Sequence, residues 1–351
     1  MTSELGPIKI RNFKCFSALT IESVGRLNLI AGKNNVGKTM LLDAISLFAS
    51  GADPKRLFQI IDRRENPDSE GKLFLAVRNY VPLGGVSISI GSHKLEFQMP
   101  APTMISQSGG EPPWREFRNQ PNSTTHPSLF VTSDSQSFAF DLNFAGRTSA
   151  YSDTFSVDPQ IRQSMSRYQS TSDLDISPTL YRKLWDEEVD GRKAEKDLIE
   201  LLRLMDLEVE SITLPSSGGR ALPRIRLRDQ DELLPITTFG DGMSRLFTLG
   251  LALVASKGGF LLVDEIENGL HHSLFPKLWK FLFEACARLD VTLFATTHSH
   301  DATVSFSKRA VMYPGGTGVL SRLEMQKKGI VAIQYSEMEG LIASEEGLEV
   351  R

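Results

Sequence analysis

The sequence predicts an α/β fold with a mixed sheet, an antiparallel β lobe and a helical or irregular insertion. Near the amino end, an apolar strand at Leu27–Ala31 runs into a glycine-rich turn and an apolar helical segment at Lys38–Ala49. From Arg224 onward, segments typical of strands and helices alternate to the end of the chain. Between these two parts lies a long Ser- and Thr-rich stretch, which predicts an insertion.

Length and composition exclude several classes of protein. The 351 residues suffice for two domains, or for one domain with a large insertion. Hydrophobic residues make up 40% and charged residues 23%, so the chain can bury a core. The net charge of −4 argues against a protein that coats nucleic acid through overall charge. Two cysteines and no apolar run long enough for a membrane span or signal peptide predict a cytoplasmic protein.

The first 223 residues predict strands, then the insertion, then helix. Short strands are expected at Ile8–Ile10 and Leu19–Glu22, and a hairpin is expected to pair Val86–Ile90 with Lys94–Gln98. Residues 101–179 predict a loosely packed insertion, with a strand or two near residues 138–144. Helix is expected again at Leu180–Met205. We therefore divide the chain into three parts: residues 1–100, 101–223 and 224–351.

The last part predicts a sheet with helices between its strands. A helix is expected from Asp241 to about Ser256. Apolar segments predict strands at Phe260–Val263, Val291–Ala295, Ala310–Tyr313 and Val319–Met325. The acidic residues near the end are expected on a solvated helix face with no supporting core; they are Glu337, Glu339, Glu345, Glu346 and Glu349.

The turn after the first buried strand matches the phosphate-binding pattern G-x-x-x-x-G-K-[ST]. Its residues are Gly32, Lys33, Asn34, Asn35, Val36, Gly37, Lys38 and Thr39. The glycines let backbone N–H groups surround phosphates, and the following helix directs its positive end at them. We expect Lys38 to reach the β and γ oxygens of a nucleotide and Thr39 to bind Mg²⁺. The alternative is a surface turn without a ligand, which the order of strand, turn and helix makes less favourable.

A second motif places two carboxylates after a buried strand. Asp264 and Glu265 follow the four apolar residues Phe260–Val263. Ligands of open α/β sheets bind at the carboxyl ends of the strands. We expect Asp264 to hold Mg²⁺ through its water shell and Glu265 to polarise the attacking water as general base. Alone, the pair is equally explained as two solvated acids, but the phosphate-binding turn favours the functional interpretation.

Two further segments complete the candidate site. Gly240, Asp241 and Gly242 open a helix, where they form either a second anion cradle or a glycine-rich N-cap without a ligand. His298 follows the strand expected at Val291–Ala295, where an imidazole can hydrogen-bond a γ-phosphate or the attacking water. The other neighbouring histidines lack the spacing of a metal site.

These motifs, in this order, resemble those of the ABC-type ATPases of the SMC, RecF and OLD group, including small stand-alone OLD-like ATP-binding proteins. The resemblance covers residues 1–50 and 224–351, including the opening Ile10–Phe16 and the closing Gly347–Arg351. Gly32–Thr39 matches the Walker A motif, Asp264–Glu265 the Walker B motif, Phe239–Met243 the signature, Glu267–His271 the D-loop and His298 the H-loop histidine.

The resemblance implies a P-loop ATPase head that uses ATP and Mg²⁺ and works as a dimer enclosing two ATP molecules. Gly240 and Gly242 of one chain would close over the nucleotide held by Lys38 and Thr39 of the other. The wider family has a serine at the position of Gly240, so backbone amides would replace one hydroxyl contact. Two residues are candidates for the Q-loop glutamine, Gln59 and Gln136.

The resemblance leaves the biological role open between two classes. One is an ATPase that senses or regulates for a separate effector, such as a TOPRIM-type nuclease or a toxin in phage defence. The other is a DNA repair or recombination ATPase that binds DNA directly. For the second class, Arg224, Arg226 and Arg228 share one strand face near Arg220 and could contact a phosphate backbone. The favoured alternative is a half-buried antiparallel strand whose charged face lies in water. A scaffold locked by ATP is a third possibility, against which the intact Glu265 argues.

Effector activity within this chain has little support in the sequence. Only 53 residues follow His298, and we expect much of that length to finish the sheet. The acids of the insertion are scattered through Ser-rich sequence, where a rigid metal site is rarely built. We therefore expect the effector to be another polypeptide.

Overall fold

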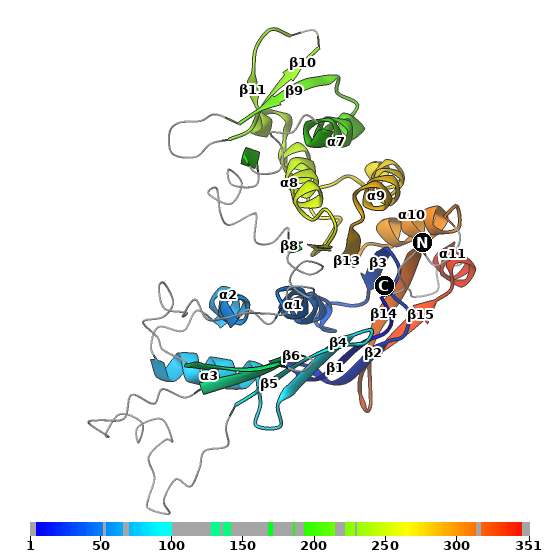
Figure 1. The fold of residues 1–351 in the computed structure, drawn as a ribbon. Helices are drawn as coiled ribbons and strands as arrows, with labels where there is room; N and C mark the ends of the chain where they lie inside the picture. Colours follow the sequence, from blue (N-terminus) through cyan, green and yellow to red (C-terminus); the bar gives the residue numbers. More distant parts are fainter. Residues whose placement is uncertain are drawn as a thin grey trace, which may run out of the picture.

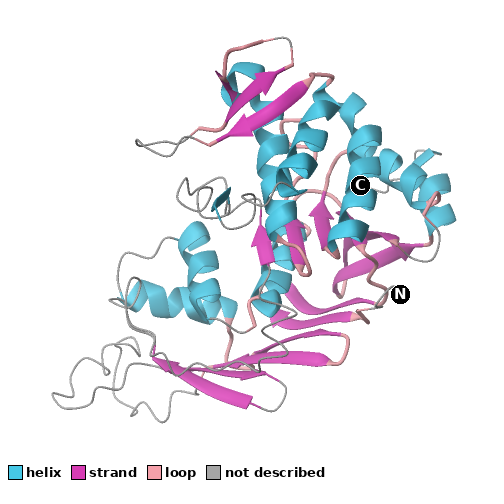
Figure 2. Ribbon diagram, turned by 45° about the horizontal axis from the view of Figure 1, so that its top comes forward, coloured by secondary structure: helices cyan, strands magenta, loops and turns pink. Residues whose placement is uncertain are grey.

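The computed structural model describes residues 5–51, 54–65, 70–99, 128–133, 136–141, 168–170, 185–186, 193–214, 222–228, 230–313 and 317–345. The fold is mixed α/β, as the sequence predicts, with one mixed sheet and two antiparallel sheets (Figures 1 and 2). In the described part of the chain, no helix has the length and apolar character that crossing a membrane requires.

The mixed sheet is the centre of the molecule. Its strands, in spatial order, are β15 (Gly329–Tyr335), β14 (Gly318–Gln326), β3 (Leu27–Ala31), β13 (Thr292–Thr296), β12 (Phe260–Val263) and β8 (Tyr168–Ser170). All neighbours are parallel except β15, which pairs antiparallel with β14. Every residue of β3 and β12 is buried, because the sheet is covered on both faces.

An antiparallel sheet lies on one side of the mixed sheet, with helix α1 (Lys38–Ala49) between the two (Figure 1). Its strands, in spatial order, are β2 (Phe16–Ile21), β1 (Ile8–Phe13), β4 (Val86–Ile90), β5 (His93–Gln98), β6 (Ser128–Ser133) and β7 (Gln136–Asp141). Apolar residues of both sheets meet α1 in one core, which explains why almost every residue of this helix is buried. The strand expected near residues 138–144 is present as β7.

The other face of the mixed sheet is covered by helices. They are α7 (Lys193–Leu202), α8 (Asp241–Ala255), α9 (Phe275–Leu289), α10 (His300–Ala310) and α11 (Glu337–Glu345). Helices α7 and α8 pack so closely that a Cβ at Gly250 would lie 2.8 Å from Leu198 Cδ2. A small sheet of β11 (Leu234–Pro235), β10 (Arg224–Leu227) and β9 (Val209–Thr213) stands beyond α7 (Figure 1).

Three expectations about the elements need correction. Helices α2 (Pro54–Glu65) and α3 (Glu70–Tyr80) were not expected. The apolar run Ala310–Tyr313 is no strand: α10 ends at Ala310, and the Tyr313 ring stacks on Phe283 of α9 at 4.9 Å between centroids. Helix α11 does have a supporting core, because its residue Ala343 is buried in the core between the helices and the mixed sheet. Of the predicted helix Leu180–Met205, the structure describes residues 185–186, α7 and a 3₁₀ turn at Arg203–Met205.

Candidate nucleotide-binding and hydrolysis site

The predicted phosphate-binding turn lies between β3 and the amino end of α1. Gly32 and Gly37 have φ angles of 146° and 89°, a region that other residues rarely adopt. A Cβ at Gly32 would lie 2.7 Å from the Leu323 carbonyl oxygen, and one at Gly37 would lie 2.7 Å from Cys15 Sγ. Both positions therefore require glycine for conformation and for space, and the backbone of the turn stays open to a phosphate chain.

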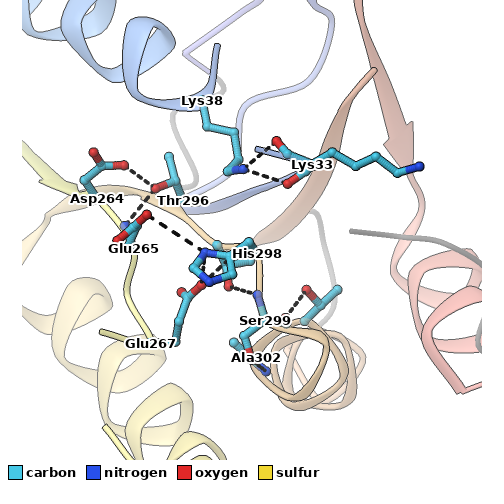
Figure 3. A network of polar contacts seen from close by, with 12 residues as sticks. Lys33, Lys38, Asp264, Glu265, Glu267, Thr296, His298, Ser299 and Ala302 are labelled. Atoms are coloured by element: carbon cyan, nitrogen blue, oxygen red, sulfur yellow. Dashed lines mark hydrogen bonds and ion pairs between the residues drawn. The ribbon is translucent and has the colours of Figure 1, made fainter. Parts of the chain in front are cut away.

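Lys38 is the first residue of α1 and is buried. Its Nζ donates to the carbonyl oxygens of Gly32 at 2.6 Å and Lys33 at 2.9 Å (Figure 3). Burial lowers the pKa of Lys38, and the carboxylates of Glu267, Asp264 and Glu265 oppose this shift. The ammonium group thus stands between the turn and three acidic side chains.

The strand order brings Thr39 and Asp264 together. β3 leads into Thr39 and β12 leads into Asp264, and only β13 separates these two parallel strands. Thr39 Oγ1 donates to Asp264 Oδ1 at 3.4 Å. Two oxygen ligands at the carboxyl edge of the sheet are the donors that Mg²⁺ prefers.

Thr296, the last residue of β13, contacts both acids of the Walker B motif. Its Oγ1 donates to Asp264 Oδ1 at 2.6 Å and accepts the backbone N–H of Glu265 at 2.8 Å (Figure 3). Glu265 has a φ of 49°, which is uncommon for a residue with a side chain and is found where surrounding contacts hold it. Thr296 supplies one such contact.

His298 lies beside two glutamates. Its Nδ1 is 3.0 Å from Glu267 Oε1 and 4.0 Å from Glu265 Oε1, and its backbone N–H donates to Glu267 Oε1 at 2.8 Å (Figure 3). The side chains of Glu265 and His298 are 50% and 49% exposed, whereas Glu267 is 11% exposed. The two groups predicted to act on water and phosphate are therefore accessible.

The glycine pair of the predicted signature lies at the amino end of α8. Gly240 is the N-cap residue, and both Gly240 and Asp241 are exposed. Gly242 lies against the turn after the Walker B motif, since a Cβ there would be 3.1 Å from the Gly269 carbonyl oxygen. One turn further along α8, Arg245 Nη2 donates to the Asp264 carbonyl oxygen at 3.0 Å. Helix α8 is thus tied to the acidic motif of its own chain.

Other candidates lie outside this cluster. Gln59 is exposed on α2 and accepts a hydrogen bond from Arg56 at 3.2 Å. Gln136 begins β7, the edge strand of the antiparallel sheet, and no described contact chooses between the two glutamines.

The arginine strand is charge-balanced by its neighbour. Arg226 Nε lies 3.0 Å from Glu210 Oε2, and Arg228 Nη1 lies 3.2 Å from Glu208 Oε2. The strand is half-buried, with its charged side in water. Two of the three arginines therefore face carboxylates, one in β9 and one just before it, which weakens the case that they bind DNA. Arg220 lies outside the described residues.

Two contributors to the site were missed in the sequence. Thr296 and Arg245 hold the acids in place. The pattern around Arg245 does not indicate which loop it contacts. The Thr–Thr–His–Ser run that begins at the last residue of β13 was a usable signal for Thr296, because a hydroxyl at a strand end faces the same sheet edge as the acids.

Two family models match the chain. An "AAA ATPase domain" matches residues 4–103, and an "AAA domain, putative AbiEii toxin, Type IV TA system" matches residues 191–305. The first range includes the phosphate-binding turn, and the second includes Gly240, Asp264, Glu265 and His298.

Known proteins also share the sequence or the fold. An "ATP/GTP phosphatase" of Helicobacter pylori is 24% identical over 84% of this chain and 85% of its own length. A short stretch, 14% of this chain, is 43% identical to 23% of the uncharacterized protein MJECL10 of Methanocaldococcus jannaschii. A solved Smc head domain from Pyrococcus furiosus, bound to the C-terminal domain of ScpA, has a TM-score of 0.52 at 12% identity and covers 98% of this chain and 99% of its own. A second SmcHead structure, bound to the C-winged helix domain of ScpA, has a TM-score of 0.52 at 13% identity, with 95% and 98% covered.

The structural likeness establishes the fold, and the family models and the phosphatase relative agree on the chemistry. Together with the arrangement of Lys38, Asp264 and Glu265, they confirm the resemblance that the motifs suggest. The protein is an ATPase, and it resembles the P-loop ATPases of the SMC, RecF and OLD group.

Proposed function

We propose that the protein hydrolyses ATP with Mg²⁺ as a dimer that encloses two nucleotides, and that its nucleotide state regulates a separate effector in the cytoplasm. The observation that carries the proposal is the exposure of Glu265 and His298 at the sheet edge. A second chain can cover this edge and exclude water from the reaction. The exposed amino end of α8, with Gly240 and Asp241, is the surface that we assign to the partner's nucleotide.

The side chains present fit ATP and Mg²⁺. Gly32 and Gly37 hold the turn in a backbone conformation that other residues rarely adopt, and Thr39 and Asp264 offer oxygen ligands 3.4 Å apart. When bound, Mg²⁺ would neutralise charge on the β and γ oxygens. Asp264 would hold the ion through its water shell, with Thr39 as a direct ligand.

Each remaining residue has an assigned step. Lys38 binds the β and γ oxygens, and Glu265 takes a proton from the attacking water. His298 donates a hydrogen bond to the γ-phosphate or orients that water. The backbone amides at Gly240 and Gly242 supply positive potential from the partner chain, because a single P-loop leaves the outer γ oxygens facing solvent.

The identity of the nucleotide and the effector belongs to the same proposal. No segment resembles the guanine-binding motif Asn-Lys-x-Asp of GTPases, so we propose that the protein prefers ATP to GTP. Equal competition by unlabelled GTP for the ATP site would contradict this preference.

The type IV toxin–antitoxin description of one family model supports a defence role with a nuclease or toxin as partner. The purified chain should then leave DNA and RNA intact with ATP and Mg²⁺ or Mn²⁺. Cleavage that is lost when its own acidic residues are replaced would place the effector inside this chain.

Mixing two inactive variants tests the shared site. Lys38→Ala removes the phosphate contact, and Gly240→Glu places a negative charge where the partner's γ-phosphate would lie. A Cβ at Gly240 has no atom within 4 Å, so the new side chain has space in its own subunit. Gly258→Glu is a matched control, because Gly258 also has a positive φ, 73° against 86°, and open space around it.

We expect each variant alone to be nearly inactive and the equal mixture to recover about a quarter of the wild-type rate. Half of the dimers are then mixed, and each has one intact site out of two. A mixture that stays inactive, or a Gly240→Glu protein as active as Gly258→Glu, would contradict a site built from two chains.

A further inference from the structure

Glu267 lies in the turn after the Walker B motif and points inward, unlike Glu265. One of its oxygens, Oε1, accepts the His298 backbone N–H at 2.8 Å and lies 3.0 Å from His298 Nδ1 (Figure 3). A carboxylate that contacts both the main chain and the ring of one histidine fixes the loop and the rotation of the ring together. With Nδ1 turned toward Glu267, Nε2 is the ring nitrogen left for the reaction.

The second oxygen of Glu267 has no role in holding His298. Oε2 is buried, and among the residues that the structure describes it has no hydrogen-bond partner. A buried carboxylate oxygen without a partner is costly, so a function rather than stability explains the acid at this position.

We propose that Glu267 is a positioning residue. From its buried place beside His298, it orients the imidazole toward Glu265 and the γ-phosphate. This inference rests on the roles proposed above for Lys38 and His298. Glu267 need not touch the substrate, because its contacts reach the reaction through the imidazole.

The same turn connects His298 to the surface proposed for the partner. Gly269, two residues beyond Glu267, places its carbonyl oxygen against Gly242 at the start of α8. Through Gly269, the turn that carries Glu267 therefore connects the amino end of α8 to His298.

Four variants and a control test the positioning role in the full-length protein. Glu267→Ala removes both contacts to His298, whereas Glu267→Gln keeps an acceptor of the same length. His298→Ala is combined with Glu267→Ala to form a double-mutant cycle. Glu284→Ala, at an exposed position of α9, controls for the loss of one glutamate. Circular dichroism checks that each variant is folded, and ATP hydrolysis is measured over a range of ATP concentrations.

We expect Glu267→Ala to lower kcat about 10- to 100-fold with little change in KM, since a misplaced group slows chemistry more than binding. Glu267→Gln should recover most of this loss, and Glu284→Ala should match wild type. In the His298→Ala background, Glu267→Ala should lower kcat less than about twofold further, because its effect passes through the histidine.

Two results would overturn the inference. One is a Glu267→Ala protein with wild-type kcat, and the other is a full additional loss in the His298→Ala background. Either leaves the proposed function intact as long as Lys38→Ala abolishes ATP hydrolysis and His298→Ala lowers kcat to a rate that is still measurable. A His298→Ala protein with normal activity would contradict the proposed role of His298 itself.

Discussion

Thr296 supports both acids of the site from the neighbouring strand. Thr296→Val keeps the shape of the side chain but removes the hydrogen bonds to Asp264 Oδ1 and to the Glu265 N–H. A buried donor or acceptor that loses its hydrogen-bond partner costs about 1–3 kcal/mol. Here the lost hydrogen bonds would leave the Asp264 carboxylate and the Glu265 backbone less firmly positioned. We expect kcat to fall about tenfold or more, and half-maximal activity to need more Mg²⁺.

The measurement is ATP hydrolysis against Mg²⁺ concentration. Thr213→Val, at an exposed position of β9, is the control, because it makes the same chemical change away from the site. An unchanged kcat and Mg²⁺ dependence in Thr296→Val would show that the acids hold their positions without it.

Lys38 predicts how nucleotide affinity depends on pH. Burial lowers its pKa in the free protein, and bound phosphates favour the ammonium form and raise the pKa again. Nucleotide affinity is therefore highest at pH values below the lowered pKa of Lys38. It falls as the pH rises from this pKa toward the ordinary pKa of a lysine. We expect a labelled ATP analogue to bind progressively more weakly above neutral pH, in the alkaline range. Lys38→Arg, which stays charged, should bind with little pH dependence in this range, and a wild-type affinity that is equally flat would contradict the account.

At the scale of elements, α1 is held by α2 as well as by the two sheets. Asp43, on the α1 face toward α2, is 3% exposed and contacts Arg63 and Arg64, each at 2.7 Å. Burial raises the pKa of Asp43, and the two arginines limit the shift. Removing one partner of a buried ion pair leaves the others uncompensated and typically costs 3–5 kcal/mol.

We therefore expect Asp43→Ala to lower the free energy of unfolding by about 3 kcal/mol or more in urea denaturation followed by circular dichroism. Glu208→Ala, which breaks the exposed pair with Arg228, should cost no more than about 1 kcal/mol. Equal losses in the two variants would show that the α1–α2 contact does not stabilise the fold.

The sequence predicted those elements whose local pattern matches their environment. β3 and β12 are apolar because both faces of the sheet are covered. The conformation of the turn at Gly32–Thr39 follows from its own glycine pattern. Ala310–Tyr313 was misjudged because a helix end that packs on Phe283 is as apolar as a strand. Helix α2 was predictable as well, because its apolar residues follow the spacing of one helix face.

The site was predictable residue by residue but not as a network. Lys38, Thr39, Asp264 and Glu265 stand in motifs whose spacing follows from phosphate binding. Their contacts with Thr296 and Arg245 depend on strand order, since β13 lies between β3 and β12 in space although it comes last of the three in the chain. Pairing across such distances leaves no signal in a local pattern.

At the scale of the whole molecule, the account makes ATP part of the subunit interface. Each nucleotide would contact Lys38 and Thr39 of one chain and the amino end of α8 of the other. Binding to the dimer and not to the monomer shifts the equilibrium toward the dimer, and hydrolysis removes this free energy. The dimer should therefore form with ATP and separate after turnover.

Light scattering on Glu265→Gln tests this claim most directly. Loss of the general base should slow turnover about 10²- to 10⁴-fold and leave ATP in place. We expect a monomer without nucleotide and a stable dimer with saturating ATP and Mg²⁺, and we expect Glu265→Gln combined with Lys38→Ala to remain monomeric. A Glu265→Gln protein that stays monomeric with saturating ATP and Mg²⁺ would contradict the shared site.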